Sequence, residues 1–141
     1  TEAHMNPTLT ALTGFIAWTL LLLVLMESVR SKMVLTKEVP ANGFRPDNAN
    51  LSPFMQRLAR AHANCLEGLP IFGGLLLVAA AAGRTEITDP LAYVLLAARI
   101  VQSLIHLGSL SPAAVTLRFT AFAVQMAIAA YWAIRLLGIQ A

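Results

Sequence analysis

Four long apolar stretches alternate with polar segments along the chain. Each stretch is long enough to cross a bilayer as a helix, which takes about 20 residues. A proline that follows an asparagine, serine or aspartate opens each stretch, which is a typical helix start. We therefore predict an all-α integral membrane protein. It is expected to be one domain over residues 5–141, a four-transmembrane-helix bundle with helices at about 7–33, 53–82, 90–107 and 112–137.

The composition supports this class. Of the 141 residues, 57% are hydrophobic and 12% are charged, and the mean hydropathy is +0.69. Soluble domains carry about twice that share of charged residues. The net charge of +3 is small and dispersed, so we expect no nucleic-acid partner. Cys65 is the only cysteine, which excludes an intrachain disulfide. Residues 1–4 precede Met5 and are interpreted as the remnant of a cloning tag.

Basic residues gather on one side of the predicted bundle. The loop after the first helix, with its flanks, holds several of them, whereas the opposite side holds Arg84 and Arg135. Cytoplasmic segments of membrane proteins are enriched in lysine and arginine. We therefore expect this loop in the cytoplasm and both termini on the opposite side. The basic residues of the loop and its flanks are Arg30, Lys32, Lys37, Arg45, Arg57 and Arg60.

One face of the second predicted helix is polar. Arg57, Arg60, Asn64 and Glu67 recur at spacings of three, four and three, so they fall within an arc of roughly 80°. Charge inside a membrane helix is costly and points to a partner, a cavity or a ligand. Pro70 follows this face and predicts a kink just past Glu67.

The third and fourth helices carry a second polar set. Arg99, Gln102 and His106 share a face of the third, and Arg118 and Gln125 lie one heptad apart on the fourth. With Arg30 at the end of the first helix, the cations outnumber the embedded carboxylates. This excess favours an anionic ligand, such as a small zwitterion with more than one carboxylate. No spacing of residues predicts a metal or nucleotide site.

The same residues also permit structural interpretations. Glu67 could form structural ion pairs with Arg60 or Arg99 that have no ligand role. Gln125 could serve only as an interhelical hydrogen bond. His62 lies about 160° from Arg60 around the helix, so it could serve such a site only from a neighbouring subunit of an oligomer.

The segment from Arg60 to Pro70, Arg-Ala-His-Ala-Asn-Cys-Leu-Glu-Gly-Leu-Pro, resembles a family signature. That signature reads Arg, Ala, polar, any, Asn, any two, Glu, then Pro. It is characteristic of the MAPEG family, the membrane-associated proteins of eicosanoid and glutathione metabolism. The position of the signature, the four-helix length and Arg99 agree with the resemblance, which covers about Asn6 to Leu137. The chain resembles a bacterial-type member.

The resemblance implies a homotrimer with glutathione as co-substrate, bound between adjacent subunits and open to the cytosol. By position, the arginine expected to stabilise the glutathione thiolate, and so the catalytic residue, is Arg118. Arg30 and His62 would come from the neighbouring subunit. The residues expected to bind glutathione from the second and third helices are Arg60, Asn64, Glu67, Arg99, Gln102 and His106.

The sequence therefore predicts a glutathione transferase or peroxidase-like enzyme. The acceptor is expected to be an apolar electrophile, or a lipid hydroperoxide, that arrives from the membrane lipids. We expect the protein in the bacterial inner membrane with its site facing the cytoplasm. One alternative is a non-catalytic lipid-binding or scaffold member of the same family. A small four-helix multidrug transporter is disfavoured because Glu27 lies near the end of the first helix, not in its middle.

Overall fold

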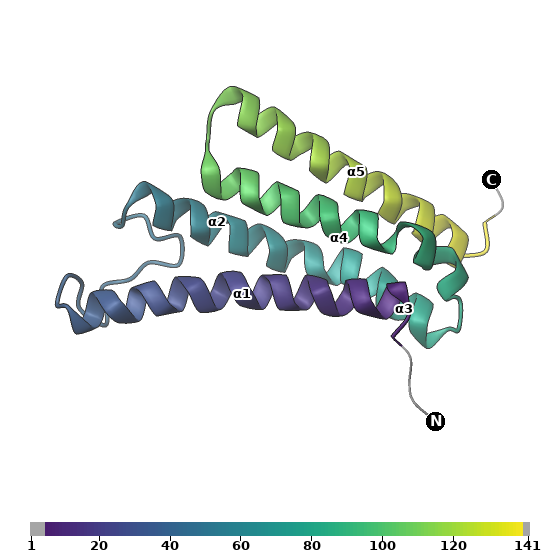
Figure 1. Ribbon diagram of the computed structural model, residues 1–141, viewed down its shortest axis with the longest axis horizontal. Coiled ribbons are helices and arrows are strands. Elements are labelled where there is room, and N and C mark those ends of the chain that lie inside the picture. Colours follow the sequence, from purple (N-terminus) through teal and green to yellow (C-terminus); the bar gives the residue numbers. More distant parts are fainter. Residues whose placement is uncertain (1–4, 140–141) are drawn as a thin grey trace.

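The computed structural model describes residues 5–139, so the interpreted tag remnant lies outside the described residues. The described chain forms four long helical rods. They lie side by side, and the start of the first and the end of the last are at the same end of the bundle (Figure 1). Each rod is long and apolar enough to cross a membrane. The elements are α1 (Pro7–Leu35), α2 (Pro53–Gly68), the π-helix η1 (Leu69–Gly73), α3 (Gly74–Ala81), α4 (Thr85–Gly108) and α5 (Pro112–Leu136).

Three of the helices begin with a proline behind a capping side chain. The Asn6 side chain accepts a hydrogen bond from the backbone N–H of Leu9 at 2.9 Å. In the same way, the hydroxyl oxygens of Ser52 and Ser111 each accept a hydrogen bond from the backbone N–H three residues later in the chain, at 3.3 and 3.2 Å. These caps satisfy N–H groups that a helix start leaves without partners, so α1, α2 and α5 begin where the sequence predicts.

The third rod is longer than expected. α4 begins at Thr85, five residues before Pro90, the predicted start. Asp89 does not cap the helix, because its carboxylate accepts hydrogen bonds from the backbone N–H and the hydroxyl of Thr8 on α1. Thr88 bonds the same Thr8 hydroxyl at 2.6 Å. The aspartate that suggested a helix start therefore ties α4 to the start of α1.

The second rod changes its helical form at Pro70. Proline cannot donate to the carbonyl four residues earlier and its ring crowds that carbonyl. The structure accommodates it in the π-helix η1, a wider helical turn of the kind often found at functional sites. Beyond it the regular helix resumes as α3, which ends at Ala81, one residue short of the expected end.

The packing leaves α2 and α5 apart. α5 packs along α4 and reaches α3 and η1 at one end, but the backbones of α2 and α5 make no contact within residues 5–139. In Figure 1 the two helices lie on opposite sides of α4 near the α4–α5 turn. A core around Phe15, Phe72 and Trp132 holds the other end of the bundle together. The space between α2 and α5 is where the polar faces meet.

Candidate functional site

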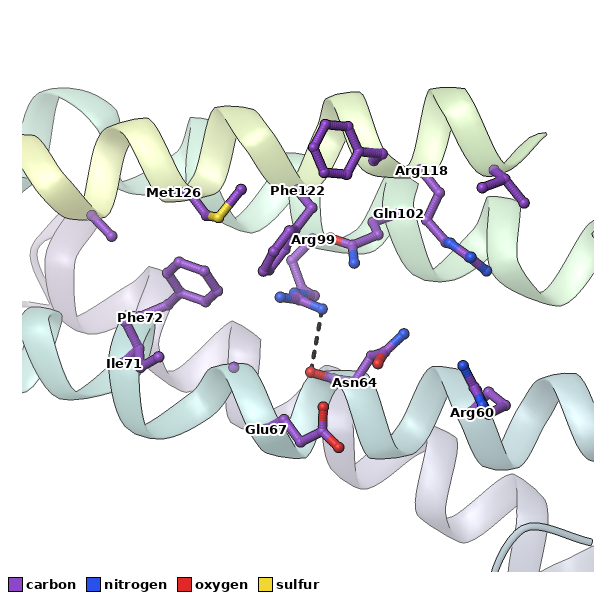
Figure 2. A pocket seen from close by; sticks show the side chains of 14 residues that line it. Arg60, Asn64, Glu67, Ile71, Phe72, Arg99, Gln102, Arg118, Phe122 and Met126 are labelled. Atoms are coloured by element: carbon purple, nitrogen blue, oxygen red, sulfur yellow. Dashed lines mark hydrogen bonds between the residues drawn. The ribbon is translucent and has the colours of Figure 1, made fainter. Parts of the chain in front are cut away.

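A cavity of about 650 Å³ lies between α2, η1, α4 and α5. Figure 2 shows side chains from these elements converging on it. Its size falls in the usual range for small-molecule sites, about 300 to 1,000 Å³. The predicted site residues that line it are Arg60, Asn64, Glu67, Arg99, Gln102 and Arg118.

Arg99 is the most buried cation of the cavity, with 1% of its surface exposed. Its Nη1 donates a long hydrogen bond of 3.4 Å to the backbone carbonyl of Asn64. Its Nε and Nη2 are enclosed and have no hydrogen-bond partner in the described part of the chain. A buried guanidinium is expected to find a partner for each donor, so this one is under-satisfied.

Aromatic rings surround the Arg99 guanidinium. Its central carbon lies 5.4 Å from the ring centre of Phe15, 5.5 Å from that of Phe72 and 6.0 Å from that of Phe122. Ring faces attract a cation and pack against a flat guanidinium. The three rings come from α1, η1 and α5, so they hold the charge at the junction of the helices without neutralising it.

The charged groups of the cavity are not paired with each other. Among residues 5–139, the ion pairs are Arg30 with Glu27 and Arg84 with Glu86. The pairs of Glu67 with Arg60 or Arg99, which the sequence permitted, are therefore not formed. Glu67 is exposed on α2, and the positive charges of the cavity outnumber its one carboxylate.

His106 lies at a second, smaller cavity of about 390 Å³ beside the first. Arg60 and Arg118 line both cavities. The Nδ1 of His106 is 3.2 Å from the side-chain nitrogen of Asn64, so the two share a hydrogen bond between α4 and α2. The structure thus places His106 next to the main cavity and in contact with one of its lining residues.

Arg30 and His62 do not line either cavity. The Arg30 guanidinium donates to the side chain of Asn48, to the Glu27 carboxylate and to the backbone carbonyl of Arg45. It also lies over the ring of Phe44. In the described chain, Arg30 anchors the loop between α1 and α2, and His62 on α2 lies near the charges of Glu27 and Arg30.

The aromatic surroundings of Arg99 were not predicted. Phe15 and Phe72 look like ordinary apolar residues of membrane helices, and no local pattern links them to Arg99. Phe122 offered a weak signal, because it follows Arg118 by four residues and so lies on the same face of α5. The Phe119 and Met126 side chains add apolar surface to the cavity wall.

Comparison with known proteins agrees with this architecture. The sequence model of the MAPEG family matches residues 8–138, nearly the whole chain. The chain belongs to the MAPEG family. The search of curated proteins and the search of solved structures each gave no match. The membership and the four apolar rods make it an integral membrane protein of a family concerned with glutathione chemistry.

Proposed function

We propose that this MAPEG protein is a glutathione-dependent transferase or peroxidase-like enzyme. The observation that carries the proposal is Arg99, a buried cation on the wall of a cavity, with no carboxylate paired to it in the described residues. An uncompensated charge inside a membrane bundle is expensive. A ligand that brings its own anionic groups would offset that cost.

Glutathione fits the chemistry of the cavity. It is a tripeptide with two carboxylates, one ammonium group, two peptide links and a thiol. Arg60 and Arg99 offer guanidinium groups to the carboxylates, and Glu67 offers an acceptor to the ammonium group. Asn64 and Gln102 offer amides that match peptide groups. The family membership independently favours this thiol over other small zwitterions.

Arg118 is proposed to stabilise the thiolate. It is half-buried near the start of α5 and lines both cavities. A thiol next to a cation loses its proton more readily, and the thiolate is the reactive nucleophile.

In a transfer reaction the sulfur forms a bond to an electrophilic carbon, and the leaving group departs with the electron pair of its bond to that carbon. With a hydroperoxide, the sulfur attacks the terminal oxygen, the O–O bond breaks and an alcohol is released. A second glutathione then reduces the oxidised sulfur, giving a disulfide and water.

The second substrate is proposed to come from the lipid. Ile71 and Phe119 are exposed, with 59% and 62% of their surfaces accessible, and they line the cavity from η1 and α5. Met126 and Ala129 continue this apolar wall along α5. An apolar electrophile dissolved in the bilayer could enter here and meet the polar end of the cavity, where Arg60 and Arg118 lie.

The assembly and orientation are part of the same proposal. We infer a homotrimer in which Arg30 and His62 act at the site of a neighbouring subunit, as the family resemblance implies. By the positive-inside rule, the basic loop between α1 and α2 favours a site on the cytoplasmic side. In a bacterial cell this would be the inner membrane, with both termini on the other side.

A non-catalytic lipid-binding or scaffold role is the second candidate. It is favoured by the three rings around Arg99, because cation–π contacts can hold a structural arginine without a ligand. The two candidates differ in one property. An enzyme must bind the thiol as a thiolate, whereas a scaffold need not bind it at all.

The deciding experiment is calorimetric titration of the detergent-purified protein with glutathione, paired with the ultraviolet absorbance of the thiolate. Binding with a thiolate signal supports the enzyme. The same measurement on Arg118→Gln tests whether Arg118 stabilises the thiolate. Arg135→Gln is its matched control, because Arg135 lies at the opposite end of α5 and donates a hydrogen bond to Tyr131. The absence of binding at millimolar glutathione would contradict the proposal and favour the scaffold.

A further inference from the structure

Two glutamines face each other across the contact between α4 and α5. Gln125 on α5 is fully buried, and Gln102 on α4 is 6% exposed. The Nε2 of Gln125 donates to the Oε1 of Gln102 at 2.7 Å. The same Nε2 also donates to the backbone carbonyl of Ala121, one turn earlier on α5, at 3.0 Å.

The Ala121 carbonyl determines the orientation of both amides. A backbone carbonyl can only accept, so the end of the Gln125 amide that faces it must be the nitrogen. That nitrogen then donates to Gln102, and the atom of Gln102 that faces it must be the oxygen. Reversing either amide would bring two acceptors or two donors together. The Gln102 nitrogen is therefore turned away from α5.

The side-chain nitrogen of Gln102, which does not bond Gln125, faces the cavity. Gln102 lines the cavity, and its Nε2 has no hydrogen-bond partner within residues 5–139 but is not enclosed. Figure 2 shows this nitrogen directed toward α2. Two N–H donors thus lie at the cavity wall one helical turn from Arg99. The enclosed Oε1 of Gln125 is left without a partner, a cost that opposes the gain from the two hydrogen bonds donated by its Nε2.

We propose that Gln125 is a positioning residue that holds Gln102 with its N–H donors toward the bound ligand. The donors would bind a carboxylate or peptide carbonyl oxygen of a peptide thiol, and they would disfavour a ligand that presents an N–H at this point. The ligand part of this inference rests on the proposed glutathione function. The orientation of the amide does not, so the two can be tested separately.

The first test uses no ligand. Protein labelled with ¹⁵N-glutamine has four side-chain amides, and the Gln102→Met variant identifies the signals of Gln102. In Gln125→Met, the Gln102 signals should shift and broaden, because its amide loses the bond that fixes it. In Val124→Met, the matched control one residue earlier and 41% exposed, they should not change. Gln102 signals that are unchanged in Gln125→Met would overturn the inference.

The second test measures glutathione affinity by calorimetry. Loss of one hydrogen bond to a charged ligand predicts roughly tenfold weaker binding for Gln102→Met and at least about threefold for Gln125→Met. The double variant should bind no more weakly than Gln102→Met, because Gln125 acts only through Gln102. Additive losses would show that Gln125 has a separate structural effect and would overturn its positioning role. If wild-type protein binds no glutathione, the proposed function fails, and the amide signals still decide the orientation.

Discussion

The Arg99 guanidinium lies against the backbone of Gly68 on α2. A Cβ at Gly68 would be 2.8 Å from the Nη2 of Arg99 and 3.1 Å from the ring of Phe72. The first contact is closer than packing allows, and the second is tighter than most contacts in proteins. The absence of a side chain at residue 68 therefore makes room for the buried cation between α2 and the aromatic rings.

Gly68→Ala is expected to displace Arg99 while leaving the helix intact, since alanine favours a helix more than glycine does. The guanidinium lies among three side-chain rings, so its displacement should change the shape of the cavity and leave the backbone in place. We predict roughly tenfold weaker glutathione binding by calorimetry, equivalent to about 1.4 kcal/mol.

Gly74→Ala is the matched control for that change. Gly74 is also helical, and a Cβ there meets nothing within 4 Å. It should leave affinity unchanged and keep or slightly raise the unfolding temperature. Equal affinities for wild type and Gly68→Ala would show that the position of Arg99 does not matter for the ligand.

Arg99→Met separates a ligand-binding arginine from a structural one. Burying an incompletely paired charge costs free energy, so replacing it by a flexible apolar side chain removes that cost. We therefore expect an unchanged or higher unfolding temperature together with a loss of glutathione binding. A large fall in stability with affinity retained would instead assign Arg99 to the packing of Phe15, Phe72 and Phe122.

Local patterns were enough to predict four membrane helices and the polar face of α2. Spacing alone put Arg60, Asn64 and Glu67 on one side, and all three line the cavity. The aromatic surroundings of Arg99 could not be predicted in this way, because Phe15, Phe72 and Phe122 come from separate elements. Their meeting is a consequence of tertiary packing, which leaves no periodic signal in the sequence.

The start of α4 shows the same limit. Asp89 followed by Pro90 is a good local signal for a helix start, yet α4 already begins at Thr85. The aspartate is used by Thr8, which lies 81 residues away in the sequence. A side chain that could cap a helix serves a distant partner when that partner offers two donors, and local reasoning then misplaces the boundary.

Asp89→Ala should destabilise the protein without affecting its ligand. It would leave the Thr8 backbone N–H and hydroxyl without their acceptor, which predicts a loss of about 1–3 kcal/mol. Thermal unfolding in detergent and glutathione titration measure the two effects. Glu86→Ala is the control on the same turn: Glu86 is exposed and pairs with Arg84 at the surface, so its loss should cost much less stability than that of Asp89 and leave binding unchanged. Weaker binding in Asp89→Ala would mean that the two ends of the bundle are coupled.

Asn48 is expected to anchor the loop that follows α1. It is fully buried, has a left-handed backbone with φ of 56°, and donates to the Met55 carbonyl at 2.7 Å while accepting from Arg30. Asn48→Ala should cost about 1–3 kcal/mol of unfolding free energy, because it leaves Arg30 and Met55 without a partner. Asn42→Ala, exposed in the same loop, is the control for thermal unfolding.

A double-variant cycle on Arg30 and Asn48 tests whether these two residues anchor the loop together. If Arg30 holds the loop through Asn48, the losses in Arg30→Met and Asn48→Ala should be clearly less than additive. If Arg30 acts only on glutathione in a neighbouring subunit, Arg30→Met should weaken binding with no change in stability. The two outcomes distinguish an arginine that shapes its own subunit from one that completes the site of the next.

Arg118→Gln tests the chemistry directly. Glutamine keeps polarity and much of the length of the side chain but removes the charge that would stabilise a thiolate next to it. We expect the thiolate absorbance of bound glutathione to disappear and turnover with an apolar electrophile to fall by roughly 10²-fold, about 2.7 kcal/mol.

Binding of S-methyl glutathione, which has no ionisable thiol, should change little. Arg135→Gln should match wild type in all three measurements. A thiolate signal that persists in Arg118→Gln would move the stabilising role to Arg60, the other guanidinium that lines both cavities.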